Sequence, residues 1–294
     1  MELNHIQTIV VIGAGVMGRG IALVCARSGF QTVLFDVKPE MLTQAQAYVE
    51  KFFHRSVEKK KLLPEERDAA LGRLAYTTVA EDLIGDLIIE AVPESLDLKH
   101  RVLSPIQAQN SPETIMASNT STLPITRIAA GLPHPDRVVG LHFFNPAPLM
   151  KLVEVIAGAD TDPAVQATMV ALARKLDKTP VQAADTPGFI VNRVARQFYL
   201  ESLRIVEEGA ATFPVVDRLM RSSGFRMGPF ELMDLIGVET NHAVTQSMYA
   251  AFFQDEKFRP SLLQQQKVDA GHFGRKTRRG FYRYPEEEER PKQK

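Results

Sequence analysis

His142 and Glu154 are the residues of this chain whose types and spacing most clearly suggest proton chemistry. They lie in LHFFNPAPLMKLVEVI, residues 141–156, a stretch that is otherwise mostly apolar. An imidazole can accept a proton near neutral pH, and a carboxylate beside it fixes the tautomer and stabilises the imidazolium. A buried histidine and glutamate can also satisfy one another as a purely structural pair. Residue types alone leave these two interpretations equally open.

Three glycines near the N-terminus have the spacing of a dinucleotide-binding turn. In VVIGAGVMGRG, Gly13, Gly15 and Gly18 follow a β-rich apolar run and precede a helical pattern. Such glycines permit a sharp turn, the approach of a pyrophosphate and close helix–strand packing, while the helix N-terminus offers free N–H groups to the phosphates. Asp36 lies at the expected distance to bind both ribose hydroxyls and repel a 2′-phosphate, although it could be a simple turn residue. The pattern predicts NAD in preference to NADP, despite Lys38 nearby, with FAD as a weaker alternative.

Alternating strand and helix patterns are expected to position these residues. The predicted strands are 6–12, 31–36, 86–92, 114–119, 137–143, 151–156 and 179–183. The predicted helices are 17–28, 39–71 with a break at Pro64, 96–109, 125–130 and 163–176. This alternation implies βαβ units and a largely parallel sheet. His142 then lies near the carboxyl end of a strand, where doubly wound sheets bind ligands.

After DTPGFIVNR the pattern becomes purely helical, over 188–207, 214–222, 229–236 and 238–252. The sequence therefore predicts an α/β fold with two domains. Residues 1–185 form a Rossmann-type, doubly wound, mostly parallel sheet, and 186–294 form an all-α domain. The tail PEEEERPKQK, residues 285–294, has no apolar periodicity and is predicted to be disordered.

Composition excludes several classes of function. The 294 residues carry a formal net charge of zero, so no overall field attracts nucleic acid or an anionic membrane, and an anionic ligand must be recognised locally. No apolar stretch approaches the ~18 residues of a membrane span. The single cysteine, Cys25, is expected to be a buried filler and cannot form an intrachain disulfide. These features indicate a cytoplasmic protein, or one whose targeting segment has been removed.

The other histidines lie in polar or helical surroundings, and surface positions are expected for all of them. They are His5, His54, His100, His134, His242 and His272. Their spacing does not match a metal-ligand pattern, so no metal site is predicted.

Six ordered segments resemble the L-3-hydroxyacyl-CoA dehydrogenase family, which includes 3-hydroxybutyryl-CoA dehydrogenases. They are VVIGAGVMGRGIA, AVPE, SNTSTL, GLHFFNPAPLMKLVEVI, DTPGFIVNR and MGPFELMDLIG. The similarity extends from about Ile9 to Tyr284, nearly the whole chain. It implies an enzyme that converts (S)-3-hydroxyacyl-CoA and NAD⁺ into 3-oxoacyl-CoA, NADH and a proton. It also implies a homodimer formed through the helical domain.

The resemblance assigns roles to individual residues. His142 would be the general base and Glu154 its carboxylate partner. Ser121 and Asn192 would hydrogen-bond the reacting oxygen or the thioester of the substrate, and such donors favour negative charge on oxygen. A helix cap is the structural alternative for Ser121, whereas a buried, unpaired amide would be costly at Asn192.

The same resemblance extends to cofactor and CoA contacts. Glu94 and Lys99 would lie near the nicotinamide and its ribose, with Asn119 and Met17 shaping the pocket. A helix cap for Glu94 and a solvated helix face for Lys99 are the structural alternatives, and the latter is favoured for Lys99. In the basic run 59–61, the resemblance assigns the CoA phosphates to Lys60 and Lys61.

Two segments leave the substrate open. KTRRGFY carries Arg278 and Arg279 where family members often have KTGxGFY, which puts local turn geometry or an acyl-end contact in doubt. FRPSLLQQQKVDAG also resembles bacterial members that act on 3-hydroxyadipyl-CoA in phenylacetate breakdown. The terminal carboxylate of that substrate would need a cation, for which Arg226, Arg259 and Arg279 are candidates.

Two further hypotheses compete with this enzyme class. One is a non-catalytic, structural NAD-binding protein. The other is a dehydrogenase for a free hydroxy acid or sugar acid.

Overall fold

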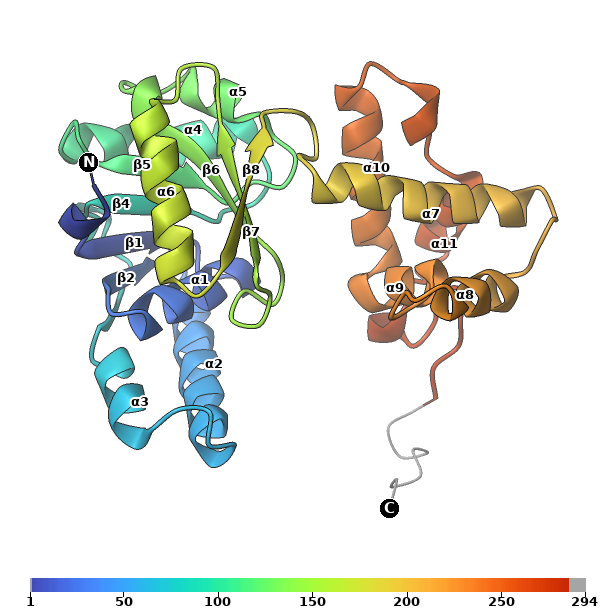
Figure 1. Cartoon of the computed structure of the whole chain (residues 1–294), viewed down its shortest axis with the longest axis horizontal. Helices are drawn as coiled ribbons and strands as arrows, with labels where there is room; N and C mark the ends of the chain where they lie inside the picture. Colours follow the sequence, from blue (N-terminus) through green and yellow to red (C-terminus); the bar gives the residue numbers. More distant parts are fainter. Residues whose placement is uncertain (1, 286–294) are drawn as a thin grey trace. The chain divides into compact units, whose positions relative to one another are not determined.

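The computed structural model describes residues 2–285, and its contacts divide the chain between Phe189 and Ile190. The first unit is a sheet with helices on both faces, and the second is helical (Figure 1). This confirms the predicted fold class. Except for Pro285, the tail that was predicted to be disordered lies outside the described residues.

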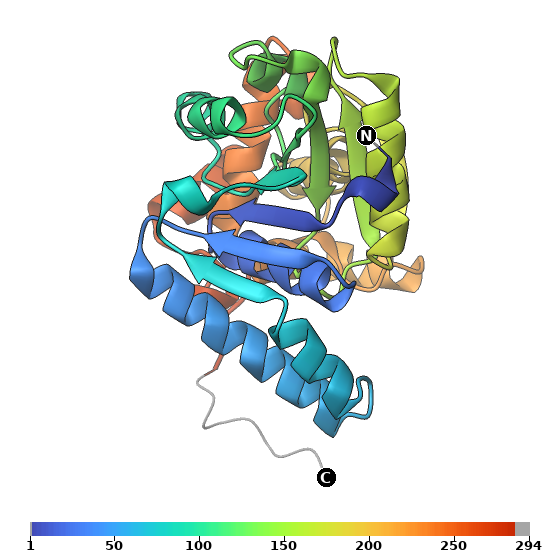
Figure 2. The same ribbon diagram turned by 90° about the vertical axis from the view of Figure 1, so that its left-hand side faces the viewer.

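The sheet of the first unit has eight strands. They are β1 (Thr8–Ile12), β2 (Gln31–Phe35), β3 (Leu74–Thr77), β4 (Leu87–Glu90), β5 (Ile115–Ser118), β6 (Val138–Phe143), β7 (Leu152–Ala157) and β8 (Thr179–Ala184). Their order is β3-β2-β1-β4-β5-β6-β7-β8, and every neighbouring pair is parallel except β6 and β7. The chain builds outward from β1 to β3 and then returns to place β4 beside β1 (Figure 2). The strand order thus reverses between β1 and β4, where doubly wound sheets bind ligands.

Helices cover both faces of this sheet. They are α1 (Val16–Arg27), α2 (Pro39–Glu58), α3 (Pro64–Leu71), α4 (Leu96–Gln109), α5 (Ile125–Ala129) and α6 (Pro163–Lys175). Successive residues of β1 point to opposite faces. Ile9 and Val11 pack in the core that includes α1, α2 and α6, whereas Val10 and Ile12 pack in the core that includes α4 and α5. Burial on both faces explains why the central strands are continuous apolar runs.

Two features of this unit differ from or refine the predicted pattern. Pro64 occupies the first turn of α3, so the helical run over 39–71 is divided at the proline, as predicted. Strand β3 was not predicted. It is a four-residue strand at the sheet edge, with no buried residue and therefore no apolar signature.

The second unit consists of helices around one core. They are α7 (Val191–Glu207), α8 (Phe213–Ser222), α9 (Pro229–Ile236), α10 (Val238–Ala251) and α11 (Leu262–Asp269), the last of which was not predicted. Short 3₁₀ segments lie at Leu3–His5, Ala80–Asp82, Pro135–Arg137, Glu256–Phe258 and Arg275–Thr277. Among residues 2–285, no helix is both long and apolar enough to cross a membrane.

The C-terminal segment of the described chain is held against the second unit by two buried aspartates. Asp234 accepts hydrogen bonds from the backbone N–H groups of Phe281 and Tyr282, each at 2.9 Å. The hydroxyl of Tyr282 donates to Asp217 at 2.6 Å. Arg278 has φ 57°, a left-handed conformation that favours glycine. The turn therefore forms with an arginine, Arg278, at the position where family members often have glycine.

The prediction that all histidines outside 141–156 lie at the surface was wrong for His242. Its side chain is buried between α10 and α11, where Nε2 contacts the amide oxygen of Gln265 at 2.7 Å and Nδ1 that of Gln264 at 3.4 Å. The partners come from a helix that the sequence pattern did not reveal. Within the described residues, no group of three His, Cys, Asp or Glu side chains is arranged to hold a metal ion.

Candidate active site

The glycine turn between β1 and α1 has the geometry that its spacing predicts. Gly13 has φ 97°, and a Cβ there would lie 2.8 Å from the carbonyl oxygen of Ala91. A Cβ on Gly18 would lie 1.7 Å from the carbonyl oxygen of Gly13, so helix and turn could not approach one another with any other residue. A Cβ on Gly15 would meet nothing within 4 Å, which leaves that side of the turn open for a phosphate.

Asp36 joins this turn to the end of β2. Its Oδ2 accepts a hydrogen bond from the N–H of Ala14 at 2.8 Å, and its Oδ1 accepts one from Lys38 N–H at 3.0 Å. A carboxylate offers about four acceptor positions, so two remain for ribose hydroxyls. Met17 lies half-buried in the first turn of α1 and packs against the core. Asp36 is thus part of the turn's construction and is more than an exposed turn residue.

His142 and Glu154 are directly opposite residues of the antiparallel pair β6–β7. The Nδ1 of His142 lies 2.8 Å from Glu154 Oε2, and the two residues are 6% and 0% exposed. The imidazole also packs against the rings of Phe144 and Phe189, with centroids 4.5 and 5.8 Å away. Nε2 has no hydrogen-bond partner within residues 2–285, so it is the nitrogen left to exchange a proton.

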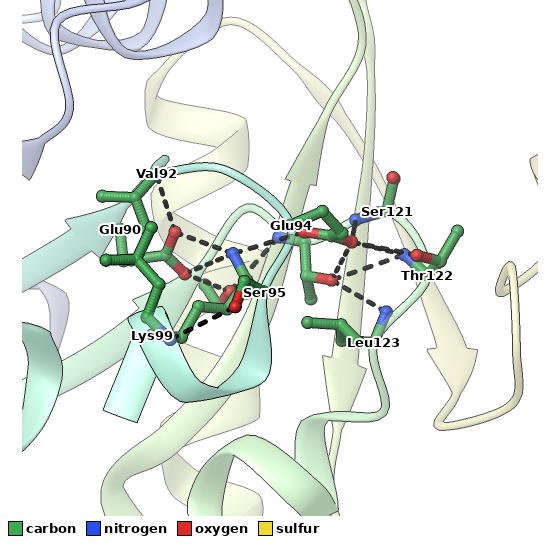
Figure 3. A network of polar contacts seen from close by, with 11 residues as sticks. Glu90, Val92, Glu94, Ser95, Lys99, Ser121, Thr122 and Leu123 are labelled. Atoms are coloured by element: carbon green, nitrogen blue, oxygen red, sulfur yellow. Dashed lines mark hydrogen bonds and ion pairs between the residues drawn. The ribbon is translucent and has the colours of Figure 1, made fainter. Parts of the chain in front are cut away.

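A buried ion pair joins the end of β4 to α4 (Figure 3). Both oxygens of Glu90 lie 2.8 Å from the Nζ of Lys99, in the first turns of α4. Glu90 Oε2 also accepts a hydrogen bond from the hydroxyl of Ser118 at 2.6 Å. Lys99 is only 1% exposed. The favoured alternative of a solvated helix face for Lys99 was therefore wrong.

Glu94 ties the loop after β5 to this ion pair. Its Oε1 accepts hydrogen bonds from the Thr120 hydroxyl at 2.5 Å and from the N–H groups of Ser121 and Thr122 at 3.0 Å (Figure 3). Its Oε2 lies 3.3 Å from Lys99 Nζ. Burial alone would raise the pKa of Glu94, but Lys99 and these donors outweigh it and hold the pKa below its usual range.

The helix-cap alternatives for Glu94 and Ser121 were also wrong. Ser95 caps α4 by accepting the N–H of Leu98, and Pro124 precedes α5. Ser121 instead lies half-buried in the loop that Glu94 holds. Neither residue's polar contacts are explained by the start of a helix.

Asn119 links this loop to the strand that carries the histidine. Its Oδ1 accepts a hydrogen bond from the N–H of Phe143 at 2.9 Å. Ser121 follows the carboxyl end of β5, and His142 lies in β6 next to its last residue, so the two residues are at the same end of neighbouring strands that Asn119 connects. Asn192 belongs to the second unit, where it lies half-buried in the first turn of α7.

A pocket of about 460 Å³ lies along α2. It is lined by Tyr48, Lys51, Phe52, Arg55, Ser56, Lys59, Lys61 and Leu149. Of the two lysines to which the resemblance assigns the CoA phosphates, Lys61 lines this pocket. Lys60 does not line it and has a left-handed backbone conformation, with φ 54°. Lys51 and Arg55 were missed, although their spacing from Lys59 repeats every four residues along one helix face and could have revealed them.

Comparison with known proteins identifies the family. Residues 8–186 match the model for the 3-hydroxyacyl-CoA dehydrogenase NAD-binding domain, and residues 188–284 match that for the C-terminal domain. The chain belongs to the 3-hydroxyacyl-CoA dehydrogenase family. It is thus an NAD-dependent oxidoreductase, which sets aside the non-catalytic alternative.

Individual relatives of this dehydrogenase carry two substrate names. It is 44% identical to the Escherichia coli 3-hydroxyadipyl-CoA dehydrogenase over 97% of this chain, but spans only 60% of that relative's length. It is 40% identical to a probable 3-hydroxybutyryl-CoA dehydrogenase of Deinococcus radiodurans, over 93% of this chain and 99% of the relative. A crystal structure of (S)-3-hydroxybutyryl-CoA dehydrogenase from Ralstonia eutropha matches with a TM-score of 0.92 at 38% identity, covering 96% and 100% of the two chains.

Proposed function

We propose that the chain oxidises short-chain (S)-3-hydroxyacyl-CoA esters, such as 3-hydroxybutyryl-CoA, to 3-oxoacyl-CoA in a reversible, NAD-dependent reaction. The observation that carries the proposal is the His142–Glu154 contact of 2.8 Å, which leaves Nε2 of His142 available. His142 accepts the proton of the 3-hydroxyl, and Glu154 stabilises the imidazolium that results. NAD⁺ bound at the glycine turn and Asp36 supplies the hydride acceptor. Ser121 and Asn192 donate hydrogen bonds to the substrate oxygens.

The pocket along α2 supports a CoA ester over a free hydroxy acid. Four of its lining residues are cationic: Lys51, Arg55, Lys59 and Lys61. Tyr48, Phe52 and Leu149 provide apolar surface beside them. This combination suits an adenine ring with phosphates, and it supplies local positive charge in a chain whose net charge is zero. We assign the CoA nucleotide to this pocket, with Lys61 among the residues that contact the phosphates.

A second candidate, 3-hydroxyadipyl-CoA, is favoured by Arg196. This side chain is 3% exposed, and its Nη1 donates to the Asn241 carbonyl at 2.8 Å and the Thr245 hydroxyl at 2.9 Å. Its Nε has no hydrogen-bond partner within residues 2–285, and burial lowers its pKa to about 10. Arg196 follows Asn192 by one helical turn and hence shares its helix face.

Arg196 is thus a better cation for a terminal carboxylate than the arginines chosen from the sequence. Arg226 and Arg279 are exposed, and Arg259 is exposed and lies 3.7 Å from Glu256. Buried charges without a partner are costly, so an incoming carboxylate would gain more at Arg196 than at these surface positions.

Steady-state rates with NAD and a series of 3-hydroxyacyl-CoA esters test the proposal. We expect 3-hydroxybutyryl-CoA to have the highest kcat/KM, with the free acid inactive. A tenfold preference for 3-hydroxyadipyl-CoA that is lost in Arg196→Met, but retained in the exposed control Arg226→Met, would establish the second candidate instead. Absence of turnover with every CoA ester would overturn both.

We further propose that the enzyme is a cytoplasmic homodimer formed through the second unit. Large apolar side chains are exposed on that unit at Val194, Leu219, Phe225, Leu235, Ile236, Phe253 and Leu262. Dimerisation through this unit would remove such side chains from water. Light scattering coupled to gel filtration should give twice the 32.7 kDa chain mass, and a monomer mass would contradict the proposal.

A further inference from the structure

The ion pair between Glu90 and Lys99 has no role in the reaction proposed above, yet it lies beneath the loop that carries Ser121. Lys99 Nζ contacts both oxygens of Glu90 at 2.8 Å and Glu94 Oε2 at 3.3 Å. The ammonium group thus donates hydrogen bonds to Glu90 and forms a longer ion pair with Glu94. Lys99 is therefore engaged with two carboxylates, one at the end of β4 and one in the loop that follows it.

Glu94 connects this ion pair to the backbone of Ser121. One oxygen of Glu94 faces Lys99, while the other accepts the backbone N–H groups of Ser121 and Thr122 and the hydroxyl of Thr120. Figure 3 shows Glu94 between Lys99 and the loop, with Ser121 on the far side. The loop is thus held at its own backbone, at the residue that carries the Ser121 hydroxyl.

A second connection fixes the start of the same loop. Glu90 accepts the hydroxyl of Ser118, at the end of β5, and the N–H of Val92, at the end of β4. Loss of Lys99 would leave two neighbouring carboxylates without a cation, one of them wholly buried. Repulsion and desolvation would then displace Glu94 from the loop.

We propose that Glu90 and Lys99 are positioning residues, which act through Glu94 to hold Ser121 where it hydrogen-bonds the substrate. The inference rests on the proposed function, because it takes Ser121 to be a substrate contact. It makes Lys99 important for turnover through its effect on Ser121.

A double-mutant cycle tests this coupling. Ser121→Ala and Lys99→Met are each expected to lower kcat about 10- to 100-fold, somewhat less than loss of a full oxyanion donor. In the Ser121→Ala background, Lys99→Met should lower kcat less than about threefold, since residues that act as one unit are not additive. NADH affinity is measured for the same variants by fluorescence titration, because the positioning role predicts a loss of kcat larger than any loss of NADH affinity. Arg101→Met, an exposed change on the same helix, is the control and should leave kcat unchanged.

Two outcomes would overturn the proposal. Multiplicative losses of kcat in the double variant would show that Lys99 acts independently of Ser121. A large rise in the NADH dissociation constant with unchanged kcat would show that Lys99 contacts the cofactor. If Lys99→Met does not fold, the cycle is run with Glu94→Gln, which leaves the Glu90–Lys99 pair intact, and the same outcomes apply.

Hydrogen exchange separates failure of this inference from failure of the proposed function. The N–H groups of Ser121 and Thr122 donate to Glu94, so Lys99→Met should speed their exchange in the ligand-free protein, whether or not any CoA ester is oxidised. Unchanged exchange at both amides would contradict the positioning role. Faster exchange in a protein that oxidises no 3-hydroxyacyl-CoA would contradict only the proposed function.

Discussion

Glu154 Oε2 lies 2.8 Å from His142 Nδ1 because the two residues are paired across the antiparallel strands β6 and β7. Side chains alternate along a strand, so a register shift of one residue would turn Glu154 to the other face of the sheet. The contact is thus set by backbone pairing, and the buried environment requires that it be made. It fixes which imidazole nitrogen faces the carboxylate and which remains for the substrate.

His142→Gln should lower kcat about 10²- to 10⁴-fold, the usual contribution of a positioned base. Glutamine keeps a hydrogen-bond contact to Glu154 but cannot accept the proton. Stopped-flow or steady-state rates with 3-hydroxybutyryl-CoA provide the measurement, and NADH titration shows whether the cofactor site is intact. A folded variant with a near-native rate would show that the His142–Glu154 pair is a structural contact and not a catalytic one.

Glu154→Gln should have a smaller effect than His142→Gln, since it retains a neutral partner for Nδ1 while it weakens the stabilisation of the imidazolium. We expect the loss of kcat to be about 10- to 100-fold, because a charge-assisted hydrogen bond is replaced by a neutral one. A loss as large as that of His142→Gln would indicate instead that the amide misorients the imidazole.

Asp36 should determine the preference for NAD. With the two acceptor positions that Ala14 and Lys38 leave open, the carboxylate binds ribose hydroxyls and repels a 2′-phosphate. Wild-type kcat/KM should be at least about 100-fold higher with NAD than with NADP, from the loss of one charge-assisted contact and the added repulsion. Asp36→Asn leaves one acceptor oxygen for the two N–H groups of Ala14 and Lys38 and removes the negative charge, so it should narrow this ratio by weakening the use of NAD. Equal efficiency of both cofactors in the wild type would refute the assignment.

Cys25 should be inert in the folded protein. It is fully buried in α1, and burial raises the pKa of its thiol to about 12. Because the thiolate is the reactive form, Ellman's reagent at pH 8 should detect no thiol in the native protein and one after unfolding in guanidinium chloride. Rapid labelling of the native protein would mean that α1 opens locally.

The elements that position the site could be predicted from the sequence because their patterns are strong. The apolar runs of β1 and β4, the glycine turn and the proline that separates α2 from α3 each have a local physical cause. Lys99 could not be placed this way. A lysine in a charged helix start is usually solvated, and only the tertiary packing of α4 against the end of β4 brings it to Glu90.

The second unit shows the same limit. Helix α11 contains QQQ in a stretch of low apolar content, so periodicity does not reveal it. His242 is buried by that helix and bonded to two of those glutamines, which explains why its surroundings in the sequence were misleading. Arg196 likewise reads as one more surface arginine of a strongly amphipathic helix until α10 packs over it.

Lys178 should make the free energy of unfolding depend on pH in the alkaline range. It is 6% exposed and donates to the carbonyl oxygens of Ala147 and Met150 at 2.6 and 2.9 Å. Burial, with Arg27 and Lys151 nearby, lowers its pKa to about 8, below the unfolded value of about 10.4. Between these pH values the unfolded state binds more protons, so the free energy of unfolding should rise with pH.

The measurement compares urea unfolding of the wild type and Lys178→Met at pH 7 and pH 9.5. Other groups titrate in this range, so the difference between the two proteins isolates Lys178. From pH 7 to 9.5 the wild type should gain on the order of 1–2 kcal/mol relative to the variant, because each pKa unit corresponds to about 1.4 kcal/mol. Lys175→Met, at an exposed position in the last turn of α6, should follow the wild type. Parallel pH profiles for wild type and Lys178→Met would show that the ammonium is not destabilised by burial, and that hydration or Asp177 compensates for it.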